Sequence, residues 1–160
     1  MKKIISLLIL IVTFSSCSED ISRNSPALEG IKDGVRWRAA GITATKTANG
    51  RLTITGVRQL ETLVLKVNSM SEFEYELGLT QLRMASFTST NGFGETTWST
   101  GDTNMAHGDG VIEITEYDEE NQTVSGTFRF NAVNQEEGAE EDVINWQSGI
   151  FYKVPLIPAE

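Results

Sequence analysis

Hydrophobic and polar residues alternate with a period of two along most of this chain. The alternation is clearest in residues 35–39, 51–55, 62–67, 73–79 and 123–133. A period of two places successive side chains on opposite faces of a β-strand, and no segment offers a helical period of useful length. About nine or ten strands joined by short turns are expected. The pattern predicts a mainly β domain, an antiparallel meander built as a sandwich or a flattened barrel, with little or no helix.

Two hairpins are predicted with particular clarity. Residues 110–117 lead through an acidic turn into residues 123–133, where Val124, Gly126 and Phe128 share one face. Asn49-Gly50 is a strong turn signal, because a type I′ turn requires positive φ at both central residues. These hairpins place antiparallel pairs near both ends of the predicted domain.

The first residues resemble an export signal. Lys2 and Lys3 precede the apolar run 4–14, which is shorter than the roughly 20 residues that a membrane-spanning helix needs. Phe14-Ser15-Ser16-Cys17 resembles a bacterial lipobox. We therefore expect residues 1–16 to be a cleaved lipoprotein signal peptide and Cys17 to be acylated and held by membrane lipid. The alternative is an ordinary secreted protein in which Cys17 is an idle thiol.

The segment after Cys17 predicts a location. Ser18-Glu19-Asp20 resembles the surface-export signal of Bacteroidota lipoproteins, although any linker beside a membrane tends to be polar. We expect residues 17–30 to be a lipidated flexible tether and residues 31–160 to be a single antiparallel β domain. The expected location is the outer membrane, with the domain facing the cell surface.

The amino-acid composition argues against several kinds of functional site. Cys17 is the only cysteine and His107 the only histidine. With Cys17 used by the lipid, we expect no intramolecular disulfide, thiolate metal site or cysteine nucleophile. The formal net charge is −9, and lysines and arginines form no cluster. We therefore expect no nucleic acid partner, no cofactor and no metal, and a lone loop histidine is expected to be solvated.

The stretch 91–110 is the longest segment without a regular pattern, and it is rich in Gly, Thr, Ser and Asn. Loops on a rigid β scaffold often carry function. Its two aromatic residues could stack on a sugar face while its polar residues bind hydroxyl groups. The alternative is that the tryptophan lies in an edge strand and covers the core. The candidate ligand-binding residues are Asn91, Phe93, Trp98, Asp102 and Asn104.

Two acidic segments, residues 118–121 and 136–142, offer oxygen ligands for Ca²⁺. Calcium takes six to eight oxygens in a shaped cage, and neither segment has EF-hand spacing. Both are therefore predicted to be solvated turns.

Several strand and turn segments resemble a known family. DGVRWRA (33–39) and TVSGTFRFNA (123–132) are similar to elements of uncharacterised Bacteroidota outer-membrane lipoproteins. That family combines a lipobox, an N-terminal NG-x-x-W-x-A element and a C-terminal SGTF-x-F hairpin. Asp33 stands here where asparagine is usual. The resemblance implies a fold and a location, and it supplies no catalytic residues.

The first functional hypothesis is a lipid-anchored, non-enzymatic binding or interaction module of the outer membrane, with another outer-membrane protein or a glycan as partner. The alternative is a glycan-capturing lipoprotein that uses residues 91–110. A second alternative is a hydrolase, because a pair of carboxylates suffices for glycoside hydrolysis and acidic residues abound.

Overall fold

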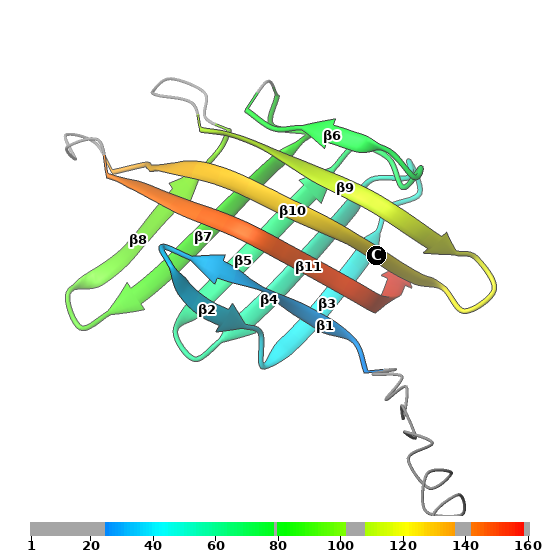
Figure 1. The fold of residues 1–160 in the computed structure, drawn as a ribbon, viewed down its shortest axis with the longest axis horizontal. Coiled ribbons are helices and arrows are strands. Elements are labelled where there is room, and N and C mark those ends of the chain that lie inside the picture. Colours follow the sequence, from blue (N-terminus) through cyan, green and yellow to red (C-terminus); the bar gives the residue numbers. More distant parts are fainter. Residues whose placement is uncertain (1–24, 79, 102–107, 137–141, 159–160) are drawn as a thin grey trace, which may run out of the picture.

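The computed structural model describes residues 25–78, 80–101, 108–136 and 142–158 (Figure 1). These residues form eleven strands and no helix, so the predicted mainly β fold is confirmed. None of them forms a helix that could cross a membrane. The strands are β1 (Ala27–Lys32), β2 (Val35–Arg38), β3 (Gly41–Lys46), β4 (Leu52–Arg58), β5 (Glu61–Val67), β6 (Glu74–Glu76), β7 (Met84–Asn91), β8 (Gly94–Ser99), β9 (Asp109–Asp118), β10 (Thr123–Asn134) and β11 (Val143–Pro158).

The strands form two layers that cross in Figure 1. One layer has the order β6-β9-β10-β11-β1-β2, and the other has the order β3-β4-β5-β7-β8. The layers join at two corners. Val133 and Asn134 of β10 pair with β8, and the end of β11 pairs with β3 in the only parallel contact of the described strands. Hydrogen-bonded pairs therefore close a ring through β3, β4, β5, β7, β8, β10 and β11, which makes a flattened barrel.

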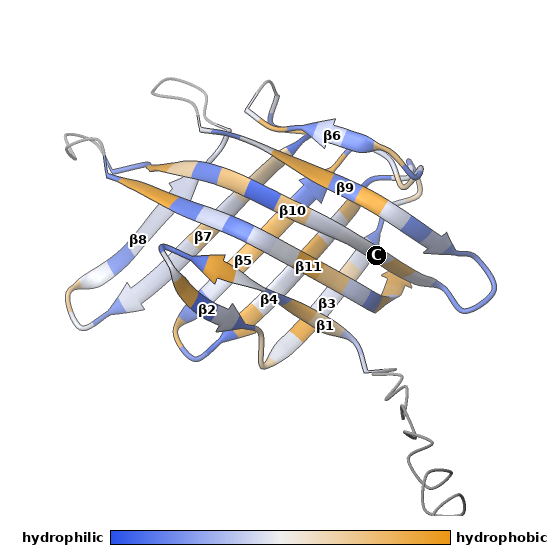
Figure 2. Ribbon diagram, viewed as in Figure 1, coloured by the Kyte–Doolittle hydropathy of each residue, from blue (hydrophilic) through white to orange (hydrophobic). Residues whose placement is uncertain are grey.

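The core between the layers is centred on Trp146, which is fully buried. Its ring lies 5.3 Å from that of Trp37, 5.6 Å from that of Phe87 and 5.9 Å from that of Phe128, measured between centroids. Trp37, Trp146 and Phe128 come from one layer and Phe87 from the other. Figure 2 shows the alternation of hydrophobic and hydrophilic residues along the strands that produces this core. Burying each such side chain stabilises the fold by about 1.5–3 kcal/mol.

Two Ser-Gly-x-Phe segments, residues 125–128 and 148–151, face each other on β10 and β11. Gly126 pairs with Phe151, and Gly149 pairs with Phe128. A Cβ atom added to either glycine would collide with the opposite phenyl ring. The SGTF hairpin of the sequence is therefore half of a reciprocal packing motif, and its glycines make room for rings.

The sequence pattern breaks at Ser148-Gly149, yet β11 continues through this point. Ser148 has a φ of 49°, and the register of β11 shifts beside it against both β10 and β1. Lys153 has a φ of 44°, and its N–H donates to the Ser125 hydroxyl over 3.1 Å. The break in the sequence pattern at Ser148-Gly149 is therefore a β-bulge, which bends a long strand without ending it.

The folded domain begins at Ala27, four residues before the boundary that the sequence predicts. Residues 27–30 were expected in the tether, but they form the start of β1 and pair with β11 and β2. Leu28 is fully buried, and a Cβ on Gly30 would lie 3.2 Å from the Trp146 ring. One large apolar side chain facing inward is too weak a local pattern to predict this strand.

The stretch 91–110 is also more regular than predicted. Its described part holds the end of β7, all of β8 and the start of β9. β8 is mostly Thr, Glu and Ser, so its alternation is hidden in the sequence. The predicted hairpin around Asn49-Gly50 is confirmed, with a different turn. Gly50 has a φ of 77° and Asn49 has no positive φ, so the turn is not type I′.

Candidate functional site

The structure separates the residues of the predicted ligand loop. Asn91 and Phe93 lie in the tight turn between β7 and β8, where the Asn91 side-chain oxygen accepts a hydrogen bond of 2.8 Å from the Phe93 N–H. The Phe93 side chain is 102% exposed. Asp102 and Asn104 lie outside the described residues, as do His107 and Cys17.

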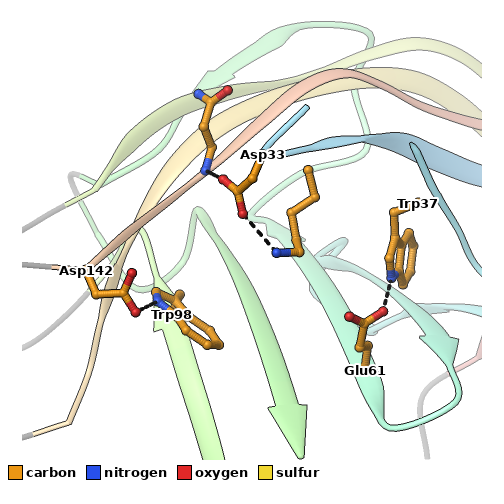
Figure 3. Close-up of polar contacts among 7 residues, drawn as sticks. Asp33, Trp37, Glu61, Trp98 and Asp142 are labelled. Atoms are coloured by element: carbon orange, nitrogen blue, oxygen red, sulfur yellow. Dashed lines mark hydrogen bonds and ion pairs between the residues drawn. The ribbon is translucent and has the colours of Figure 1, made fainter. Parts of the chain in front are cut away.

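Trp98 lies at the other end of β8, half-buried against the core. Its ring centroid is 6.1 Å from that of Phe87, and its indole N–H donates to the Asp142 carboxylate over 3.0 Å (Figure 3). Trp98 follows Phe93 by five positions along extended backbone, which corresponds to roughly 17 Å. The two aromatic side chains therefore do not form one stacking surface. Trp98 packs against the core, as the alternative hypothesis expected, but it does not lie in an edge strand, because it pairs with Phe87 of β7 and with Asn134 of β10.

Two described acidic residues of the predicted turns, Asp118 and Asp142, form hydrogen bonds within the fold. The Asp118 carboxylate accepts hydrogen bonds from the side chain and the backbone N–H of Asn121, and these bonds lower its pKa. Asp142 accepts from Trp98 and from the Asn134 side chain. Across the part of the chain that the structure describes, no group of three or more His, Cys, Asp and Glu could hold a metal ion.

A different surface brings functional groups together. We call it the outer face: the side chains of the β6-β9-β10-β11-β1-β2 layer that point away from the core. Cross-strand pairing arranges them in rows. One row holds Glu74, Glu113, Thr127, Ile150, Glu29 and Arg38. The next holds Glu76, Val111, Arg129, Gln147, Ile31 and Arg36, with the Ser148 bulge beside Arg129.

The outer face is hollowed over the second row. A shallow cavity of about 560 Å³ is lined by polar side chains above the buried rings of Phe130 and Trp146. A second hollow of about 430 Å³ adjoins it and shares Val111 and Arg129. The polar side chains that line the larger cavity are Glu76, Asp109, Arg129, Asn131, Asn145 and Gln147.

A hydrogen-bonded ladder fixes part of this lining. The Asn131 amide donates to Asp109 over 2.7 Å, and the Asn145 amide donates to the Asn131 side-chain oxygen over 2.6 Å. Asp33 continues the ladder by accepting from the Asn145 backbone N–H over 2.8 Å (Figure 3). Partial burial raises the Asp33 pKa, but the Asn145 N–H and the neighbouring Lys32 outweigh it and lower the pKa.

Arg129 stands out in this lining because its guanidinium is exposed and has no hydrogen bond or ion pair with any residue that the structure describes. A guanidinium offers five N–H donors in a planar fork. Glu76 and Asp109 add acceptors, and the amides of Asn131, Asn145 and Gln147 add groups of both kinds. Such a mixed set suits a ligand rich in hydroxyl or carboxylate groups.

Sequence reasoning missed this surface. Its residues come from four strands between positions 76 and 147, and their adjacency depends on strand order. The one available signal was polar residues at the outward positions 127, 129 and 131 of the predicted hairpin.

Comparison with known proteins places the chain in a family. No match was found among curated proteins or among solved structures. The family model described as a domain of unknown function (DUF6252) matches residues 24–155, which include all of β1 and most of β11. The match begins within the predicted tether, in agreement with the early start of the fold. The chain therefore belongs to the DUF6252 family.

Proposed function

We propose that this protein is a lipid-anchored, non-enzymatic binding module of the outer membrane that uses its outer face to hold a partner. The observation that carries the proposal is the shallow cavity around Arg129, which has no hydrogen bond or ion pair with the described residues. A guanidinium without a partner among the described residues, beside side-chain amides held by hydrogen bonds, can bind a second molecule without first breaking contacts to them. The lipobox-like segment ending at Cys17 supports the anchor.

The anchor is tested by replacing Cys17 with alanine. Acyl chains hold a protein at a membrane because each buried methylene contributes about 0.8 kcal/mol. We expect the variant to leave the membrane fraction while the wild-type protein stays there. Retention of the Cys17→Ala protein would contradict the anchor.

The binding surface is tested by photo-crosslinking in cells. A photoreactive residue at Gln147, inside the larger cavity, should capture an outer-membrane protein as a discrete product. The same residue at Thr43 is the control, because Thr43 is exposed on β3 in the opposite layer. Arg129→Ala should reduce the product at position 147, and equal products at positions 147 and 43 would speak against a site on the outer face.

Glycan capture is the second candidate, and the mixed donors and acceptors of the cavity favour it. Sugar hydroxyls both donate and accept, so they match carboxylates, amides and a guanidinium in one lining. The detergent-solubilised lipoprotein on a glycan array should retain a defined set of glycans and lose them with Arg129→Ala. An array without signal, together with a crosslinked protein partner, would favour the interaction module.

A further inference from the structure

Three turns and the start of the first strand lie on one side of the molecule. The Ala39 N–H donates to the Leu28 carbonyl over 2.9 Å, which joins the β2–β3 turn to the start of β1. The Ala40 N–H donates to Val57 over 2.8 Å, and the Thr90 N–H donates to Leu60 over 2.9 Å. These bonds connect the β2–β3, β4–β5 and β7–β8 turns in sequence, and Figure 1 shows them along the lower side with the start of β1.

This side exposes apolar side chains at its turns. Leu60 is 64% exposed and Phe93 is 102% exposed, each in a two-residue loop between paired strands. Val57, beside the β2–β3 turn, is 42% exposed. We call Leu60 and Phe93 the hairpin tips. Arg58 and Glu61 form the cross-strand pair below the first tip, so charges of both signs lie at its base.

The length of the tether limits how far this side can be from the bilayer. Ala27 follows Cys17 by ten residues, and a fully extended chain spans at most about 3.6 Å per residue. If Cys17 is acylated, β1 therefore starts within roughly 36 Å of the lipid surface. The hairpin tips extend from the same side as this attachment.

We propose that the hairpin tips form a membrane-contact surface, with Leu60 and Phe93 entering the interfacial region of the lipid bilayer. Leucine and phenylalanine are side chains that anchor peripheral proteins at this depth. Docking on the tips leaves the larger cavity free, because its lining comes from β6, β9, β10 and β11, and β6 lies along the upper side in Figure 1. The inference rests on the lipid anchor of the proposed function, and the alternatives for the tips are solvent or a protein partner.

The test is site-directed spin labelling of the acylated, full-length protein in phosphatidylethanolamine–phosphatidylcholine vesicles. An acylated Cys17 has no free thiol, so a cysteine introduced at Leu60→Cys or Phe93→Cys would take a single nitroxide label. Ala48→Cys is the matched control, an exposed turn position at the opposite end of β4. The readout is the ratio of collisions with oxygen, which partitions into lipid, to collisions with a water-soluble nickel chelate.

We expect this ratio to be several-fold higher at positions 60 and 93 than at position 48, and to fall to the control value in detergent-free solution without vesicles. Equal ratios at the three positions in vesicles would overturn membrane contact. The wild-type protein separates this failure from failure of the anchor. A wild-type chain that takes up label at Cys17 is not acylated, whereas an unlabelled, vesicle-bound chain with solvated tips refutes the contact surface alone.

Discussion

At the scale of single residues, the Ser-Gly-x-Phe repeats show how a sequence motif can be structural. Gly126 and Gly149 lie opposite Phe151 and Phe128, and each ring fills the space that a side chain on the glycine would need. Neither glycine has a positive φ. The need for space beside the phenyl rings, and not an unusual backbone conformation, therefore explains why glycine occupies these two positions. The motif is therefore explained by the close packing of β10 against β11.

Gly149→Ala should destabilise the fold by about 1–3 kcal/mol, because the new methyl group overpacks against the Phe128 ring. Gly92→Ala is the control, since nothing lies within 4 Å of a Cβ at that turn position and Gly92 has no positive φ. Urea unfolding of both variants measures the difference. Equal stability of the two variants would contradict the packing of ring on glycine.

Asp33 should make stability depend on pH. Its pKa is lowered in the folded state, so the stability that it contributes is present above the unfolded pKa of about 3.9 and is lost as pH falls through the folded value. In Asp33→Asn this contribution is absent. We expect the unfolding free energies of the wild type and the variant to converge between about pH 5 and pH 2. A gap that stays constant over this range would show that the charge of Asp33 has no role.

At the scale of elements, β1 is the strand that the sequence concealed. It donates one large side chain, Leu28, to the core, and it inserts between β11 and β2. Without β1, β2, which carries the buried Trp37, would lose the only strand with which it pairs in the described sheet. A strand with a weak local pattern thus holds an entire edge of one layer.

A chain that begins at Ser25 should fold, whereas a chain that begins at Ile31 should be largely unfolded. Loss of a buried leucine alone costs about 2–5 kcal/mol, and the shorter chain also loses the backbone pairing of residues 27–30. Circular dichroism and the dispersion of amide NMR signals distinguish the two outcomes. If the chain that begins at Ile31 unfolds cooperatively, residues 27–30 are not required for folding, and the domain boundary that the sequence predicts is correct.

At the scale of the whole molecule, closure of the ring depends on the last described residues. Leu156, Ile157 and Pro158 pair in parallel with β3, and the Leu156 N–H donates to the Gln122 carbonyl over 2.9 Å. This contact covers an edge of β3 that would otherwise be open. Closure removes strand edges, which in an open sheet are templates for association with other chains.

Ending the chain after Pro155 should open the edge of β3 and favour self-association. We expect a lower urea midpoint and a sedimentation coefficient that rises with protein concentration, because an unpaired edge offers hydrogen-bonding groups to a second chain. Ile157→Thr in the full-length chain is the control, since it changes an exposed side chain and keeps the backbone pairs. A monomeric shortened protein with unchanged stability would show that the corner contact is dispensable.

The sequence by itself determined the fold class and most of the core. Alternation in residues 123–133 and 62–67 is a local property, because each side chain of a strand points away from the next. It therefore predicted the β10 face with Phe128 and Phe130 buried. It also yielded the hypothesis of a lipid anchor at Cys17, which lies outside the described residues.

Tertiary structure alone decided where functional groups meet. Glu76, Arg129 and Gln147 line one cavity because β6, β9, β10 and β11 are neighbours, and strand order is set by packing between residues far apart in the chain. The extended backbone of β8 also separated Phe93 from Trp98, which the sequence had grouped, because Phe93 precedes this strand and Trp98 lies near its far end. A period of two in the sequence predicts which face of a sheet a side chain occupies. It does not predict which strand is the neighbour of that residue's strand.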